Sequence, residues 1–117
     1  MKNLIYYILF AFCSLGFVFV SHAQDGDIDA QRLWKKNCRK CHDADGSGGT
    51  PAGKKLKVED YTKAEAQQKF TDEEAIKVIK EGVTDENGEE RMKAYPDFSD
   101  AELAALVSLI RSFEVPE

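Results

Sequence analysis

The feature that most constrains this 117-residue chain is a run of five residues that concentrates three potential ligands. It reads Cys38-Arg39-Lys40-Cys41-His42, so two thiols stand three positions apart and an imidazole follows directly. A pair of cysteines at this spacing can form a disulfide, act as a thioredoxin-like redox pair, or supply half of a zinc site. A redox pair belongs in a βαβ setting, and a zinc site usually needs four ligands. The rest of the chain must decide among these chemistries.

The first 23 residues are expected to be a secretory signal that is removed from the mature chain. An apolar run over residues 4–20 follows a lysine and leads to Ser21 and Ala23, small residues at the two positions that a signal peptidase inspects. The alternative is an uncleaved membrane anchor, because this run approaches the roughly 20 apolar residues that span a bilayer. Membrane association is expected only in that case. Cleavage divides the chain into a signal peptide (residues 1–23) and one exported domain (residues 24–117).

Removal of the signal leaves very few sulfur or imidazole side chains that can bind a metal. One cysteine and one histidine are lost with it, and the side chains that remain are Cys38, Cys41, His42 and Met92. Three cysteine and histidine ligands are too few for a typical zinc site, whereas C-x-x-C-H is the attachment signature of c-type haem. The two thiols form thioethers to the two vinyl groups of one porphyrin, and His42 becomes the proximal ligand of the iron. The sequence therefore predicts one covalently bound haem c.

The second axial ligand of the iron follows from the same count. The mature chain has no second histidine, which excludes ligation by two histidines of one chain. Met92 is its only thioether, and it lies far enough along the chain to return to the other haem face. The alternative is that Met92 fills a gap in the core, but its charged neighbours Glu90, Arg91 and Lys93 are not typical of a core segment. We therefore expect His42 and Met92 as the metal ligands, a pair that suits an electron carrier.

Hydrophobic spacing and capping signals predict four or five helices. Leu33 and Trp34 begin an apolar stripe that predicts a first helix over about residues 30–40, capped by Asp27 or Asp29. Capping boxes predict three further helices, which begin at Thr62, Thr71 and Ser99. The apolar face of the last helix consists of Leu103, Leu106, Val107 and Ile110.

The segments between these helices are expected to be loops. Residues 42–54 hold four glycines and one proline, and residues 84–96 are charged and contain an Asn-Gly turn signal. No segment shows the sustained alternation of apolar and polar residues that is typical of a strand. The expected fold class is therefore all-α.

Composition narrows the class of protein further. The chain carries 16 basic and 21 acidic residues, a net charge of −5, so it lacks the basic excess of a nucleic-acid-binding protein. Its length allows one ordinary domain and excludes a large multidomain enzyme. There is no Ser/His/Asp arrangement and no nucleotide-binding loop, and both thiols are used in thioethers, so we do not expect an enzyme.

The chain resembles the class I monohaem c-type cytochromes of bacteria over nearly the whole exported domain. Four segments carry the resemblance: the first helix (33–38), a haem-side loop (45–53), an axial-methionine loop (91–95) and the final helix (104–112). It implies the all-α cytochrome c fold, with four to five short helices wrapped around the haem. It also implies that the carbonyl of Pro51 accepts the Nδ1–H of His42 and thereby orients the imidazole. The residues that would bind the cofactor are thus Cys38, Cys41, His42, Pro51 and Met92.

Three positions depart from the pattern of this family. Ala30 stands where glycine often allows close contact with the last helix, so we expect a slightly wider crossing there. Lys93 follows the methionine where many relatives have proline, so the loop lacks the stiffening that the proline gives. Leu109 stands where an aromatic residue is common, and we expect Trp34 to supply the missing bulk where the two terminal helices cross.

The resemblance implies a periplasmic or otherwise exported carrier that passes electrons between membrane or periplasmic redox partners. One haem edge near the thioethers is exposed in this family, and Lys35, Lys36, Arg39 and Lys40 cluster there. These side chains could dock an acidic partner or simply form a solvated helix face. The acidic segment 84–90 could equally define the partner. The alternatives to a free carrier are a haem c subunit of a larger complex and a haem protein whose labile methionine lets peroxide or another small ligand bind.

Overall fold

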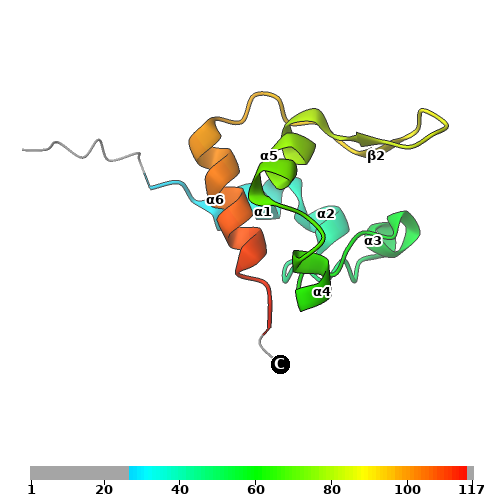
Figure 1. The fold of residues 1–117 in the computed structure, drawn as a ribbon, viewed down its shortest axis with the longest axis horizontal. Helices are drawn as coiled ribbons and strands as arrows, with labels where there is room; N and C mark the ends of the chain where they lie inside the picture. The colour runs from blue at the N-terminus through cyan, green and yellow to red at the C-terminus, as the bar shows by residue number, and fades with distance from the viewer. Residues whose placement is uncertain (1–26, 116–117) are drawn as a thin grey trace, which may run out of the picture.

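The computed structural model describes residues 27–115, which form six helices and a two-stranded hairpin (Figure 1). The helices are α1 (Ala30–Asn37), α2 (Arg39–His42), α3 (Pro51–Leu56), α4 (Ala64–Gln67), α5 (Asp72–Glu81) and α6 (Asp100–Arg111). The strands β1 (Val83–Thr84) and β2 (Glu90–Met92) pair antiparallel between α5 and α6. The predicted all-α class is confirmed, with this hairpin as an addition to it.

The segment expected to be a signal peptide, residues 1–23, lies outside the described residues. Among the helices of the described part, none is both long enough and apolar enough to cross a membrane.

The core lies where α6 packs against α1 and α5 (Figure 1). The predicted apolar face of α6 is buried, and it consists of Leu103, Leu106, Val107 and Ile110. Trp34 of α1 is 3% exposed, and its ring centroid lies 5.0 Å from that of Phe113, just beyond the end of α6. Because Trp34 belongs to the same buried cluster as Leu109, it fills the crossing of the terminal helices as expected.

Side-chain caps fix the starts of α1, α5 and α6. Asp29 accepts a hydrogen bond from the backbone N–H of Arg32 at 2.8 Å and so caps α1. The capping boxes predicted at Thr71 and Ser99 are both confirmed, with every reciprocal hydrogen bond formed. Gly82 ends α5 with a φ of +75°, a conformation that favours glycine.

The capping box predicted at Thr62 is wrong. Helix α4 begins one residue later, after Lys63, and has no side-chain cap. Asp60 accepts hydrogen bonds from both the hydroxyl of Thr62, at 2.6 Å, and its backbone N–H, at 3.0 Å. The threonine is therefore engaged by the preceding carboxylate, in a turn of the kind that aspartate favours.

Two predicted loops contain regular structure. Within residues 42–54, α3 begins at Pro51, and Thr50 caps it by accepting from the N–H of Gly53 at 2.9 Å. Within residues 84–96, the hairpin turns near Gly88, which has a φ of +80°. The signal for α3 was a threonine cap before a proline at the first helical position. The signal for the hairpin was the Asn-Gly pair, but its strands are too short to show alternation of apolar and polar residues.

Candidate functional site

One short turn carries the side chains of the C-x-x-C-H run. Helix α1 ends at Asn37, earlier than predicted, and Cys38 is its C-cap. The single-turn helix α2 follows, and the backbone N–H groups of Cys41 and His42 both donate to the carbonyl of Cys38, at 3.2 and 3.0 Å. The two thiols are free, and the described residues contain no group of three His, Cys, Asp or Glu side chains able to hold a metal ion. This arrangement supports neither the disulfide nor the zinc interpretation.

The environment of Cys38 also argues against a thiol redox pair. Burial, together with the charge of the neighbouring Cys41, raises the pKa of the Cys38 thiol to about 11. A reactive cysteine needs a lowered pKa, because the thiolate is the nucleophile and the metal ligand. The strands of the described residues form only one two-stranded antiparallel sheet, so the βαβ setting of a thioredoxin-like pair is missing there.

Two adjoining cavities open beside this turn, one of about 180 Å³ and one of about 700 Å³. The residues that line both are Cys38, His42, Tyr61, Val78 and Met92. Cys41 lines the larger cavity as well. The structure thus brings four of the five predicted site residues to one place. The fifth, Pro51, is exposed at the start of α3 and lines neither cavity.

The walls of these cavities are mainly apolar. The smaller one is enclosed by side chains from α1, α5, α6 and the segment before α5, among them Trp34, Phe70, Ala75, Ile79, Leu106 and Ile110. The larger one includes Val78 and Val83, which are 40% and 38% exposed and so are unusually open for large apolar residues of this protein. A flat apolar group bound to the cysteines would cover these valines. The lining therefore fits a porphyrin.

The half-buried imidazole of His42 lines both cavities. Its ring stacks on Tyr61, with centroids 5.5 Å apart and planes inclined by 15°, and lies 5.6 Å from the ring of Trp34. Burial lowers the pKa of His42, so the imidazole is neutral at neutral pH, as a metal ligand must be. Its Nδ1 atom is buried without a hydrogen-bond partner. A neutral imidazole with an unpaired ring nitrogen, next to two thiols, fits the donor set of haem c.

The expected hydrogen bond from His42 to the carbonyl of Pro51 is not formed in this structure, since Nδ1 has no partner. Instead, Thr50 links α3 to α2. Its hydroxyl donates to the carbonyl of Lys40 at 2.9 Å and lies 3.1 Å from that of Cys41. The residue that positions α3 beside the site is therefore the threonine cap, which the sequence analysis did not single out.

Gly53 of α3 was also missed, and its role is to allow close contact. A Cβ atom at this position would clash with the carbonyl oxygens of Cys41 and Gly48. These are backbone atoms and cannot rotate away. Only glycine lets α3 pack this closely on α2, so Gly53 is part of what fixes the C-x-x-C-H turn.

Met92 is the last residue of β2 and is half-buried. It pairs with Val83 across the hairpin, and the N–H of Tyr95 donates to the carbonyl of Ile79 in α5 at 2.9 Å. The backbone also approaches Gly82 closely, because a Cβ there would lie 2.7 Å from the carbonyl oxygen of Met92. The predicted loop is therefore fastened to the end of α5, and this attachment brings Met92 to the cavities.

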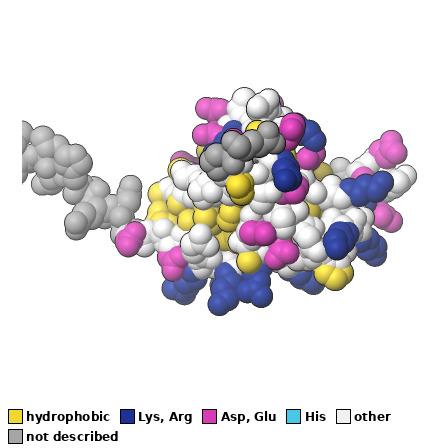
Figure 2. All heavy atoms as spheres, turned by 90° about the horizontal axis from the view of Figure 1, so that it is seen from below, with side chains coloured by type: hydrophobic (Ala, Val, Ile, Leu, Met, Phe, Trp, Pro, Cys, Tyr) yellow, Lys and Arg dark blue, Asp and Glu magenta, His cyan; other side chains and the backbone are white. Residues whose placement is uncertain are grey.

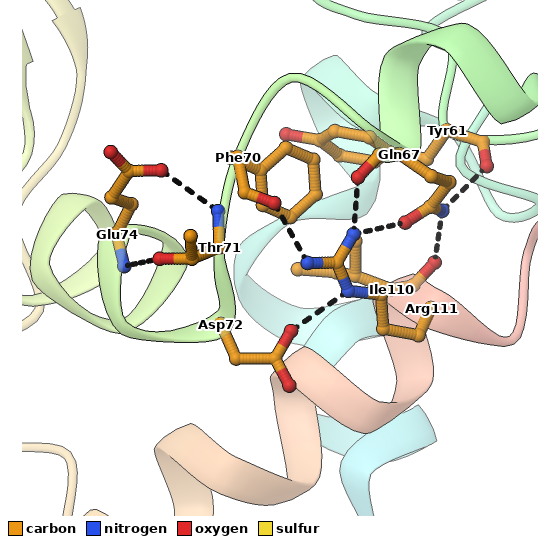
Figure 3. Close-up of polar contacts among 8 residues, drawn as sticks. All are labelled: Tyr61, Gln67, Phe70, Thr71, Asp72, Glu74, Ile110 and Arg111. Atoms are coloured by element: carbon orange, nitrogen blue, oxygen red, sulfur yellow. Dashed lines mark hydrogen bonds and ion pairs between the residues drawn. The ribbon is translucent and has the colours of Figure 1, made fainter.

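Tyr61 and Phe70, two aromatic side chains of the cavity wall, are held by a polar network at the end of α6 (Figure 3). Gln67 is 5% exposed, and its side-chain amide donates to the carbonyls of Tyr61 and Ile110, each at 2.8 Å. Arg111 donates to the backbone carbonyls of Gln67 and Phe70, to the Gln67 side chain at 3.0 Å, and lies over the Phe70 ring at 4.3 Å. This wall was not predicted, because the residues that join it to α6 are more than 40 positions apart in the sequence.

Comparison with known proteins agrees with this geometry. The sequence model of a family described as cytochrome c oxidase, cbb3-type, subunit III matches residues 27–110. A solved structure of the Kustc0563 c-type cytochrome is 31% identical, with a TM-score of 0.62, and the match covers 75% of this chain and 100% of that one. A tyrosine-to-phenylalanine mutant of Kustc0563 gives 32% identity, a TM-score of 0.60, and coverage of 74% and 100%. No curated protein sequence matches the chain.

The family match spans most of the chain, and the structural relatives are aligned over their full length. Both agree with the C-x-x-C-H turn and the apolar cavity beside it. The chain therefore belongs to the family described as cytochrome c oxidase, cbb3-type, subunit III, and it is a monohaem c-type cytochrome that transfers electrons through one covalently bound haem c.

Proposed function

We propose that this chain is an exported carrier of single electrons in which His42 and Met92 are the axial ligands of the haem iron. The observation that supports this proposal is that His42 and Met92 line the same two cavities together with Cys38. They come from different parts of the chain: His42 is held by backbone hydrogen bonds to Cys38 and Gly48, and Met92 pairs with Val83 across the hairpin. The two side chains can therefore approach one bound group from separate elements.

Haem c supplies a one-electron redox centre when it is bound. The thiols of Cys38 and Cys41 would hold it covalently, and neutral His42 would bind the iron through one ring nitrogen. A methionine thioether stabilises the reduced iron, so Met92 would raise the reduction potential. The apolar wall formed by residues such as Trp34 excludes water from the site, which also favours the less charged, reduced state.

The ligand assignment is tested by Met92→Ala, with Lys93→Gln as a control at the next, exposed position. We expect the wild-type protein and the control to be low-spin in both oxidation states and the ferrous forms to bind CO poorly. Ferrous Met92→Ala should become five-coordinate and bind CO readily. An unchanged spectrum in Met92→Ala would contradict methionine ligation and point to another side chain, such as a lysine at the cavity rim.

We further propose that the basic cluster of Lys35, Lys36, Arg39 and Lys40 docks an acidic redox partner. All four side chains are exposed, and Lys40 also lines the larger cavity. Figure 2 shows lysine and arginine side chains gathered along one edge of the molecule. Opposite charges speed the association of redox partners at low salt.

Electron-transfer rates measured against ionic strength test this docking proposal. The expected result is a rate that falls as salt rises, and that falls less steeply in a Lys35→Gln/Lys36→Gln variant. A rate that rises with salt would instead assign docking to the acidic hairpin, where Glu89 and Glu90 are exposed. A rate independent of salt would contradict electrostatic docking altogether.

Export and haem attachment are tested together by one intact-mass measurement of the purified protein. The mass expected is that of residues 24–117 plus one haem. A mass that includes residues 1–23 would mean that the segment stays as an anchor.

A second candidate is a dedicated subunit of a terminal oxidase, and the family description favours it. Co-purification from solubilised membranes distinguishes the two functions. A free carrier is recovered alone, whereas a subunit is recovered in a stoichiometric complex.

A further inference from the structure

Two side chains on either side of Met92 tie its segment to other helices. The guanidinium of Arg91, through Nη2, donates to the carbonyl of Leu56 in α3 at 2.9 Å. The hydroxyl of Tyr95 donates to the carbonyl of Asn37 at the end of α1, at 2.8 Å. The donors are four residues apart, and their acceptors lie 35 and 58 residues earlier in the chain. Both hydrogen bonds are partly buried.

The two acceptors are of the same kind, namely the carbonyl of the last residue of a helix. The last carbonyls of a helix have no partner within it. Helix α3 ends at Leu56 because Lys57 adopts a left-handed conformation with a φ of +54°, and α1 ends at Asn37. Among the described residues, neither carbonyl accepts a backbone hydrogen bond. Each hydrogen bond therefore satisfies a carbonyl that would otherwise be unpaired. The positive charge of Arg91 also interacts favourably with the negative C-terminal end of the α3 dipole.

These same two helices flank the turn that carries His42. Helix α1 leads directly into α2, and Thr50 fastens α3 to the carbonyls of α2. The hydrogen bond from Arg91 reaches α3, and the hydrogen bond from Tyr95 reaches α1. Because both helices are joined to α2, these two bonds fix the position of the Met92 backbone relative to the His42 backbone. Arg91, Tyr95 and Met92 also line the larger cavity together with His42, so the links run along its edge.

We propose that Arg91 and Tyr95 are positioning residues that hold Met92 across the cavity from His42. This inference rests on the proposed ligation by His42 and Met92. With both links formed, the segment that carries Met92 is held at the edge of the larger cavity. With either link lost, Met92 still pairs with Val83 and the N–H of Tyr95 still donates to Ile79, but the segment can swing away from α3 or α1.

The test compares Arg91→Met and Tyr95→Phe in the haem-bearing protein. Both variants keep most of the side chain and remove the hydrogen-bond donor. Lys93→Gln is the matched control, because it removes a positive charge next to Met92 that makes no hydrogen bond to another element within residues 27–115. Its Nζ lies 5.7 Å from the centroid of the Tyr95 ring, and Tyr95→Phe keeps this ring. Arg91→Lys keeps the charge and a hydrogen-bond donor, so it should hold Met92 in place better than Arg91→Met and less well than the wild type.

The quantity measured is the opening of the Met92 ligand well below the unfolding temperature, followed as CO binding to the ferrous protein. We expect the opening constant to rise about tenfold in Arg91→Met, which loses a charged hydrogen bond, and about fivefold in Tyr95→Phe. A purely structural role would lower the unfolding temperature and leave the opening constant at 25 °C unchanged. The optical absorption band of the bond between ferric iron and the methionine sulfur gives a second, independent measure of how firmly Met92 is held.

The outcomes distinguish a failure of the positioning role from a failure of the proposed ligation by Met92. If Met92→Ala binds CO readily but Arg91→Met and Tyr95→Phe behave like Lys93→Gln, Met92 is the ligand and the positioning role is refuted. If Met92→Ala keeps the wild-type spectrum, the ligation itself is refuted and the positioning role with it. If Arg91→Met fails to fold, Tyr95→Phe, which removes a single oxygen atom, still decides the question.

Discussion

Replacement of Arg111 by methionine should destabilise the fold more than replacement of any other partly exposed charged residue. The guanidinium makes an ion pair with Asp72 at 2.8 Å, in which the side chains are 32% and 60% exposed. Such a pair contributes only about 0.5 kcal/mol. The three hydrogen bonds to Gln67 and to the carbonyl of Phe70 are more important, because they are partly buried and the donor is charged.

The size of the loss follows from those groups. Without Arg111, two backbone carbonyls and the side-chain oxygen of Gln67 lose a charged donor, and water reaches them only in part. At about 1 kcal/mol for each partly solvated acceptor, the free energy of unfolding should fall by about 3 kcal/mol. For a domain of this size, that corresponds to a fall of about 12 to 24 °C in the unfolding temperature. Methionine can still lie against the Phe70 ring, but the cation–π contact of the guanidinium is lost and adds about 0.5 kcal/mol to the effect.

Guanidinium unfolding of the haem-bearing protein, followed by circular dichroism, measures this loss. Lys80→Met is the matched control, because Lys80 pairs with Asp100 at 3.5 Å and the two side chains are 45% and 98% exposed. The control should cost no more than about 0.5 kcal/mol. Equal and small losses in Arg111→Met and Lys80→Met would refute the claim that the Gln67 network stabilises the cavity wall.

Three further substitutions test the packing of the site. Gly53→Ala should cost more than about 3 kcal/mol in thermal unfolding, because its Cβ clashes with the carbonyl of Cys41, whereas Gly88→Ala, where the space is open, should cost about 1 kcal/mol for its positive φ alone. Similar losses in the two variants would contradict this argument. Trp34→Phe removes the 2.8 Å hydrogen bond from Nε1 to the carbonyl of Asp43 and should cost about 2 kcal/mol in urea unfolding. An unchanged unfolding midpoint would show that this bond is dispensable.

Local signals made the helices of this fold predictable. The capping boxes at Thr71 and Ser99 depend only on residues three apart, and the face of α6 depends only on helical spacing. The prediction at Thr62 failed because a competing carboxylate stands two residues before it. The hairpin was not predicted because its strands contain two and three residues, too few to show a period of two.

The site was predictable only as far as its chemistry is local. The C-x-x-C-H run is itself the attachment signature of haem c. Met92 is the predicted second ligand because residues 24–117 contain no other thioether. The network around Gln67 and the link from Arg91 to Leu56 join residues distant in sequence, and no local pattern announces them. The hydrogen bond expected from His42 to the carbonyl of Pro51 is not formed. A backbone acceptor cannot be inferred from residue type alone.

The hairpin that carries Met92 consists of two parts with different constraints. Its base is fastened to Gly82, Leu56 and Asn37, whereas its tip is closed by Asp85, whose carboxylate accepts from the N–H groups two and four residues on. The tip projects from the body of the protein (Figure 1). Because its geometry is self-contained, it can accept an inserted tag, a dye or a tether to an electrode without moving the redox centre. The hairpin tip is thus a suitable point at which to attach the protein to an electrode.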